Sequence, residues 1–155
     1  MDFQKELELP FPLRDYQKTG VKFLTSNSSA LLGDDMGLGK TVQVIVALKS
    51  IYEREGIFKC LIVVPNSLKS NWQNEFSIWF PDALLTVLKG NLEDRNFQLE
   101  SSTSFILCTY EQMRASFQQD NTIGEFDYLI FDEIQKLKNA TSKAYMSAYV
   151  IKSKN

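Results

Sequence analysis

The chain of 155 residues contains no histidine, only two cysteines and no long apolar run. With Cys60 and Cys108 as its only thiols and no imidazole, it is a poor candidate for a zinc site. No apolar stretch approaches the roughly 18 residues needed to span a bilayer. The N-terminus lacks the basic flank and apolar segment of a secretory signal. These absences predict an intracellular protein with neither a membrane partner nor a disulfide framework.

The chain also has little excess of either charge, with a net charge of only −2. That value argues against a basic domain that coats nucleic acid non-specifically. It is compatible with a protein that contacts a nucleic-acid backbone at a few local sites. The two cysteines lie inside the apolar runs KCLIVV and SFILC, which predicts buried, reduced thiols in core strands.

Apolar runs of strand length alternate with helical patterns along the chain. The candidate strands are Ala30–Gly33, Cys60–Val64, Leu84–Leu88, Phe105–Thr109 and Tyr128–Asp132. Several are continuously apolar, which is typical of strands buried on both faces of a parallel sheet. Helices are expected near 14–24, after Lys40, after Pro65 and around 142–151, with no strand after Asp132. The pattern predicts an α/β fold, a mainly parallel sheet covered by helices on both faces.

A phosphate-binding loop is indicated by the segment ALLGDDMGLGKTVQVIV, residues 30–46. An apolar strand runs into a glycine-containing turn, then Lys-Thr, then an amphipathic helix. Glycine lets backbone N–H groups approach phosphate oxygens, and the helix N-terminus favours anions. We expect Lys40 to act as a catalytic cation on the outer phosphates and Thr41 to bind Mg²⁺. The predicted nucleotide-binding residues of this loop are Met36, Gly37, Leu38, Gly39, Lys40 and Thr41.

An acidic pair follows the strand in FDYLIFDEIQKLKN, residues 126–139. Asp132 is placed at the carboxyl end of a buried strand, where ligands of α/β sheets bind. We expect this carboxylate to hold Mg²⁺. Glu133, the next residue, is suited to orienting or deprotonating the attacking water, so we expect it to be catalytic. Together with Lys40 and Thr41, the pair predicts a phosphate-loop enzyme that binds a nucleotide with Mg²⁺.

Several segments together resemble the Swi/Snf-type ATPases of helicase superfamily two. The segment from Asp34 to Thr41, DDMGLGKT, resembles motif I of that family, in which an aspartate stands where the general phosphate-loop pattern has its first glycine. LRDYQ at 13–17 is similar to the adenine-recognition segment. VPNSL at 64–68 resembles motif Ia, CTYE at 108–111 motif Ib, and DEIQKLKN at 132–139 motif II. The motifs occur in the family's order from about Leu13 to Asn139.

This resemblance implies a RecA-like lobe of a phosphate-loop NTPase that uses ATP and Mg²⁺ and acts on double-stranded DNA. It implies that Gln17 reads the adenine edge and that Arg14 supports the nucleotide or the local fold. Gln135 would couple the ATP site to nucleic-acid binding. Backbone contacts would come from motifs Ia and Ib and from the end of the third strand. The candidates are Ser67, Lys69, Thr109, Tyr110 and Lys89.

In this family two RecA-like lobes sandwich ATP, and the second lobe supplies arginines to the γ-phosphate. We therefore interpret residues 1–155 as an incomplete N-terminal lobe, without the strand of motif III and without the second lobe. We expect the isolated chain to bind ATP weakly and to hydrolyse it very slowly. The expected location is intracellular and DNA-associated, in a nucleus or a bacterial nucleoid.

Three alternatives stay open at this stage. One is a nucleic-acid-binding or scaffolding module with a vestigial ATP site. Another is a superfamily-two helicase that acts on RNA. A third is a different phosphate-loop enzyme, although a GTPase is disfavoured because no Asn-Lys-x-Asp segment occurs. Nothing in the sequence indicates what the motor would remodel or displace.

Overall fold

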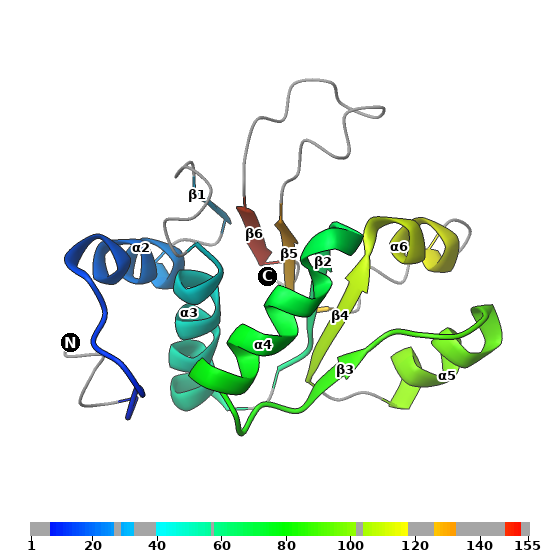
Figure 1. Ribbon diagram of the computed structural model, residues 1–155, viewed down its shortest axis with the longest axis horizontal. Helices are drawn as coiled ribbons and strands as arrows, with labels where there is room; N and C mark the ends of the chain where they lie inside the picture. The colour runs from blue at the N-terminus through cyan, green and yellow to red at the C-terminus, as the bar shows by residue number, and fades with distance from the viewer. Residues whose placement is uncertain are drawn as a thin grey trace.

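The computed structural model describes residues 7–26, 29–32, 40–56, 58–101, 104–117, 126–132 and 148–152. Six strands form a single sheet (Figure 1). The strands are β1 (Ser29–Leu32), β2 (Cys60–Val64), β3 (Leu85–Val87), β4 (Phe105–Thr109), β5 (Tyr128–Asp132) and β6 (Ala148–Lys152). The helices are α2 (Asp15–Ser26), α3 (Lys40–Glu55), the 3-10 turn η1 (Asn66–Leu68), α4 (Lys69–Trp79), α5 (Leu92–Ser101) and α6 (Tyr110–Phe117).

The strand order is β1-β6-β5-β2-β4-β3. β2 pairs in parallel with β4 and β5, and β3 pairs in parallel with β4. β1 and β5 both run antiparallel to β6, so they run parallel to each other. Five strands therefore share one direction, and their carboxyl ends lie at the same edge of the sheet. The predicted mainly parallel α/β fold is confirmed.

Residues along the central strands alternate between two hydrophobic cores. Cys60, Ile62 and Val64 of β2 belong to the core covered by α2, α3 and α4, which contains Val21, Ile45 and Trp72. Leu61 and Val63 belong to the opposite core, with Tyr110 and Met113 of α6. Because successive side chains of a strand point to opposite faces, a continuously apolar strand must be covered on both sides. The prediction of helices on both faces is confirmed.

β6 corrects the prediction of a helix, and of no further strand, near the C-terminus. Its five residues pair with β1 and β5, with Ala148 opposite both Leu32 and Asp132. The sequence AYVIK contains the β-branched residues Val150 and Ile151, which favour strands. The helical pattern depends only on residues close in the sequence. The strand is formed by pairing with β1, whose residues lie more than 100 positions earlier.

The two cysteines confirm their prediction as buried, unpaired thiols in strands. Cys60 in β2 and Cys108 in β4 are free and fully buried, on opposite faces of the sheet. Burial raises the pKa of both thiols, that of Cys108 to about 12. Among the described residues, no helix is both long and apolar enough to cross a membrane.

Candidate active site

The candidate site lies at the edge of the sheet where the parallel strands end. Leu32, the last residue of β1, and Asp132, the last residue of β5, both pair with Ala148 of β6. With strands spaced about 4.8 Å apart, these two strand ends are separated by roughly 10 Å. The residues after β1 and those at the end of β5 are the two predicted parts of an ATP site. The fold therefore brings the ends of β1 and β5 to neighbouring positions at one edge.

Several predicted site residues lie outside the described part of the chain. They are Met36, Gly37, Leu38 and Gly39 of the loop, and Glu133 and Gln135 of the acidic segment. Their assigned roles stay predictions. The described part of the site consists of the two residues that follow the loop and the carboxylate that ends β5.

Lys40 and Thr41 are the first two residues of α3. Lys40 is 8% exposed, and Thr41 is half-buried. The first four N–H groups of an α-helix have no partner within the helix, and the helix dipole adds partial positive charge there. The start of α3 is thus electropositive through its backbone and through the Lys40 side chain.

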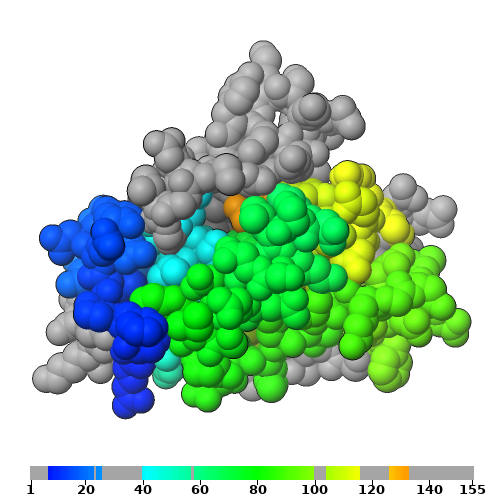
Figure 2. Space-filling model, in the orientation of Figure 1, coloured from blue at the N-terminus to red at the C-terminus, as the bar shows by residue number. Residues whose placement is uncertain are grey.

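Asp132 is 6% exposed at the end of β5. Its Oδ2 accepts a hydrogen bond from the indole Nε1 of Trp72 at 2.8 Å. Its backbone carbonyl accepts another from the hydroxyl of Tyr110 at 2.7 Å. The carboxylate and the backbone of this one residue are therefore held from two different helices, α4 and α6. In Figure 2, segment 126–132, coloured orange, reaches the surface in a small area beside the green atoms of the α4 region.

The predicted adenine-reading residue performs a structural task at the start of α2. Oε1 of Gln17 accepts a hydrogen bond from the backbone N–H of Arg14 at 2.9 Å. This is one half of a capping box, in which the third helical residue reaches back to the residue that precedes the helix. Gln17 is 9% exposed, whereas Arg14 is exposed. The contact fixes the orientation of the Gln17 amide.

The two hydroxyl side chains of motif Ib, Thr109 and Tyr110, lie inside the protein. Thr109 and Gln112 form a reciprocal capping box at the start of α6, with bonds of 2.9 Å and 3.2 Å. Tyr110 is 2% exposed, and its hydroxyl donates a hydrogen bond to the backbone carbonyl of Asp132. Thr109 is 5% exposed. Buried polar groups in proteins are almost always paired with hydrogen-bond partners. The structure thus favours internal roles for the two hydroxyls that we expected to contact phosphate.

The backbone carbonyl of Leu88 accepts hydrogen bonds from the other segments that we expected to contact nucleic acid. It accepts hydrogen bonds from Nζ of Lys69 at 3.3 Å and from Nε2 of Gln112 at 2.8 Å. Lys69 begins α4, Gln112 lies in α6, and Leu88 follows β3. Ser67, in η1 beside Lys69, is exposed. The predicted contact segments therefore meet at the same edge of the sheet as Asp132.

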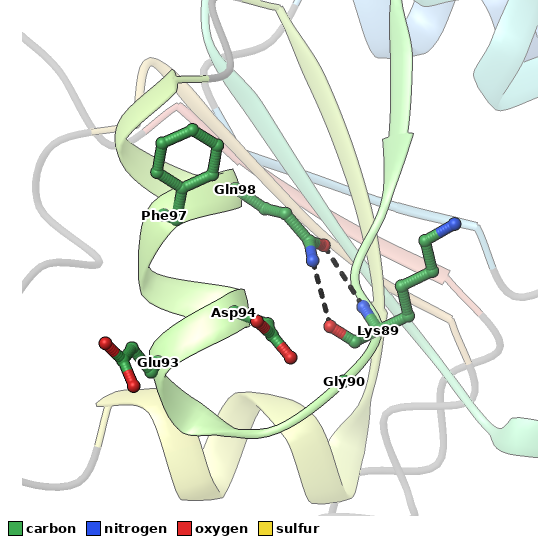
Figure 3. A pocket seen from close by; sticks show the side chains of 6 residues that line it. All are labelled: Lys89, Gly90, Glu93, Asp94, Phe97 and Gln98. Atoms are coloured by element: carbon green, nitrogen blue, oxygen red, sulfur yellow. Dashed lines mark hydrogen bonds between the residues drawn. The ribbon is translucent and has the colours of Figure 1, made fainter.

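Lys89 lies at the mouth of an open pocket between the end of β3 and α5. The pocket is lined by Lys89, Gly90, Glu93, Asp94, Phe97 and Gln98 (Figure 3). The backbone of Lys89 exchanges two hydrogen bonds with the Gln98 amide, of 3.1 Å and 2.9 Å. Its side chain extends away from α5 and from the two carboxylates. Lys89 therefore presents its charge outside the pocket.

Sequence reasoning missed Trp72 and Gln112 as parts of the site. Trp72 is 1% exposed, and its hydrogen bond to Asp132 was not foreseen. The available signal was chemical, since a buried indole N–H generally needs an acceptor. For Gln112 the signal was its position three residues after Thr109, the spacing of a capping box.

The residues present fit Mg²⁺ better than a metal that needs several protein ligands. Within the described ranges, no group of three or more His, Cys, Asp or Glu side chains could hold a metal ion. Mg²⁺ prefers oxygen ligands and keeps several waters, so one or two carboxylates and the phosphates of a nucleotide suffice. Asp132 and the hydroxyl of Thr41 supply ligands of that kind.

Comparison with known proteins gives consistent matches. The family model of the SNF2-related domain matches residues 16–155. The DNA excision repair protein ERCC-6-like of Danio rerio is 37% identical over 92% of this chain and 11% of its own length. A Drosophila melanogaster homolog of the SWI/SNF-related regulator of chromatin subfamily A containing DEAD/H box 1 is 33% identical over 97% of this chain and 19% of its own length.

A solved structure resembles the fold as a whole. The Sulfolobus solfataricus SWI2/SNF2 ATPase core in complex with dsDNA superposes with a TM-score of 0.67 and 28% sequence identity. The match covers 84% of this chain and 28% of that one. The chain thus spans only about a tenth to a third of the length of these relatives.

Proposed function

We propose that this chain, which belongs to the SNF2-related domain family, is the ATP-binding lobe of a DNA-dependent ATPase motor. The observation that carries the proposal is the meeting of two elements at one sheet edge. Lys40 begins α3 after β1, and Asp132 ends β5, with one strand between β1 and β5. A cation at the start of the helix that follows β1 and a carboxylate at the end of β5 suit a magnesium-bound polyphosphate.

In this proposal the start of α3 binds the phosphates. Backbone N–H groups of the helix N-terminus, together with Gly37 and Gly39, surround the anion, and Lys40 adds a charge-assisted hydrogen bond. Thr41 and Asp132 hold Mg²⁺, directly or through water. When bound, Mg²⁺ neutralises charge that develops on the phosphate oxygens. Glu133 orients the attacking water and accepts its proton.

Gln17 is the residue that we assign to the adenine edge. Its Oε1 already accepts the Arg14 N–H, so its amide N–H groups would donate to adenine. A side chain held in one orientation loses little entropy when it binds, which favours selection of one base over others. Arg14, exposed at the start of α2, completes this part of the nucleotide site.

DNA is assigned to the edge formed by the ends of β2, β3 and β4. Ser67 and the ammonium of Lys89 are exposed there, and Lys69 lies next to them at the start of α4. Hydroxyl and ammonium groups are common donors to backbone phosphates, and such contacts do not depend on base sequence. The dsDNA bound to the Sulfolobus structure and the DNA-repair name of the fish relative support this assignment. Gln135 would then transmit binding at this edge to the ATP site.

Hydrolysis and DNA translocation belong to the larger motor, because a second RecA-like lobe supplies arginines to the γ-phosphate in this proposal. An arginine of this kind is worth roughly 10³- to 10⁵-fold in rate. We assign chromatin or damaged DNA as the substrate of the whole motor, because the relatives are named as a DNA excision repair protein and as a regulator of chromatin. ATP binding is the part of the function that this chain performs by itself.

The proposal is tested by titrating the chain with ATP and Mg²⁺ in a calorimeter. Lys40→Ala is expected to weaken binding roughly 10- to 100-fold, because a hydrogen bond to a charged group contributes about 1.5–3 kcal/mol. Lys49→Ala is the matched control, since it removes one positive charge from the same helix. Lys49 lies over the ring of Phe80 at 5.8 Å, in the part of α3 away from its start.

Equal binding by the wild type and Lys40→Ala would favour the alternative of a nucleic-acid-binding module with a vestigial ATP site. A loss of the same size in Lys49→Ala would mean that overall charge, and not a phosphate site at the start of α3, controls the affinity. Loss in Lys40→Ala alone supports the proposal.

A further inference from the structure

Trp72 reaches the candidate magnesium site from inside the core. Its side chain is 1% exposed, and its ring packs against Phe76 with the centroids 6.5 Å apart. The indole Nε1 donates to Oδ2 of Asp132 at 2.8 Å. The apolar body of the side chain is thus fixed by packing while its polar edge contacts the carboxylate.

Packing alone does not require an indole at this position. Trp79, on the same helix, packs edge-on against Phe11 with the ring centroids 5.8 Å apart, and it is also buried. A phenylalanine at position 72 could fill most of the same space without an N–H group. The added feature of Trp72 is a charge-assisted hydrogen bond, which is shorter and stronger than one between neutral groups.

The same aspartate is also held through its backbone. The Tyr110 hydroxyl donates to the carbonyl of Asp132 at 2.7 Å. One contact therefore limits rotation of the carboxylate, and the other limits movement of the strand end. Metal-binding carboxylates commonly have outer partners of this kind, which orient them for the metal.

We propose that Trp72 is a positioning residue for the magnesium site, acting through the carboxylate of Asp132. The inference rests on the proposed function, in which Asp132 binds Mg²⁺. α4 begins at Lys69, two residues after the exposed Ser67 that we assign to DNA. The indole thereby joins the helix next to the DNA edge to the metal ligand by one hydrogen bond.

The test compares Trp72→Phe with the matched control Trp79→Phe in the full 155-residue chain. The probe is Mn²⁺, an oxygen-preferring substitute for Mg²⁺, and its affinity is measured by electron paramagnetic resonance in the presence of ADP. Trp72→Phe is expected to weaken Mn²⁺ binding about 10-fold, the lower end of the effect of removing an outer partner. The affinity for ADP without metal should stay at the wild-type value, as should Mn²⁺ binding by Trp79→Phe.

A second measurement keeps Trp72 in place. In a Trp79→Phe chain labelled with ¹⁵N-tryptophan, the only indole N–H resonance belongs to Trp72, because the sequence has two tryptophans. Asp132→Asn replaces the charged acceptor with a neutral one, so the proton resonance is expected to move upfield. This result is independent of whether Trp72→Phe folds.

The outcomes separate the two proposals. If the wild type binds ADP and Mn²⁺ and Trp72→Phe binds Mn²⁺ equally well, the positioning role is wrong and the proposed function stands. If Trp72→Phe does not fold, an indole resonance unchanged by Asp132→Asn overturns the role of Trp72. If the wild type binds neither ADP nor Mn²⁺, both proposals fail.

Discussion

At the residue scale, Asp132 shows how the fold holds a carboxylate that is only 6% exposed. Burial of a charge is costly unless the charge receives hydrogen bonds. The Trp72 indole supplies one of them, and Tyr110 binds the backbone carbonyl of the same residue. Both donors are large aromatic side chains whose rings stay in the core. The carboxylate therefore has a fixed orientation, which a metal site needs.

Three buried groups with raised pKa values make the chain sensitive to alkaline pH. Burial, and then the nearby Glu55 carboxylate, raise the pKa of Tyr128 to about 12 from its ordinary value of 10.0. The Tyr128 hydroxyl donates to Glu55 at 3.1 Å. Burial raises the pKa of the Cys60 and Cys108 thiols in the same direction. In each case the folded state holds its proton more tightly than the unfolded state does.

We therefore predict that the contribution of these groups to the free energy of unfolding does not change with pH below about pH 9. It decreases as the pH rises from there to about 12. Over that range the unfolded chain loses protons that the folded chain keeps. Urea unfolding at pH 9 and pH 11 measures the loss. Tyr128→Phe should lose less stability between these two pH values than the wild type. Tyr16→Phe, at an exposed tyrosine, should lose as much as the wild type, and a smaller loss there would contradict the assignment to Tyr128.

How far single residues were predictable depended on burial. Lys40 and Asp132 were predicted from their positions next to apolar runs, and those runs form the expected elements. Thr109 and Tyr110 carry hydroxyls on a segment that resembles a DNA-contacting motif, yet both are buried and bonded internally. A sequence shows that a hydroxyl is present, but its exposure depends on packing between distant segments.

At the scale of elements, the contact between α2 and α3 depends on a glycine. Gly20 in α2 faces Gln43 in α3, and a methyl group added at Gly20 would overlap Oε1 and Cδ of Gln43. Gln43 is fully buried, so its side chain has little space to move. The close approach of the two helices supports the position of α3, which carries Lys40.

Gly20→Ala is expected to lower the free energy of unfolding by about 1–3 kcal/mol, as overpacked core substitutions do. The loss would occur although alanine is the better helix former by about 1 kcal/mol. Urea unfolding of Gly20→Ala, Gln43→Ala and the double variant forms a thermodynamic cycle. We expect the double variant to lose less than the sum of the single losses, because truncating Gln43 removes the overlap. Additive losses, or a more stable Gly20→Ala, would show that the helices have room for the methyl group.

The elements themselves were predictable to different degrees. β2, β4 and β5 were predicted with their exact ends, because continuous apolar runs bounded by polar residues leave little choice. α5 was not predicted, since LEDRNFQLES has few apolar positions. Its start carries a local signal, in which Asn91 and Asp94 exchange side-chain to backbone hydrogen bonds of 2.9 Å and 3.3 Å. That pair is a capping box built from short polar residues.

At the scale of the whole molecule, the sheet assembles a site from segments that are far apart in the sequence. Leu32 at the end of β1 and Asp132 at the end of β5 are separated by 100 positions, and the reversed strand β6, which pairs with both strands, brings them to one edge. The sequence predicted the parallel arrangement from the strand pattern. It did not predict β6, because the four-residue apolar run from Ala148 to Ile151 is too short for its periodicity to separate a strand from a helix.

The edge near β3 and α5 offers a contrasting location for a ligand. Its pocket is lined by Glu93 and Asp94, and the Asp94 carboxylate lies beside Gly90. Two carboxylates repel a polyphosphate, so the pocket does not suit ATP. We therefore assign the nucleotide to the ends of β1 and β5 and not to this pocket.

The most direct test of that statement is a map of backbone amide chemical shifts as Mg²⁺ and ADP are added to ¹⁵N-labelled chain. We predict that the largest chemical-shift changes occur at Lys40, Thr41, Gln17 and Asp132. The indole N–H resonance of Trp72 should also shift. Amides of Glu93, Asp94 and Gln98 should stay at their starting positions. Changes centred on those three residues, with Lys40 and Asp132 unaffected, would contradict the assignment of the ATP site.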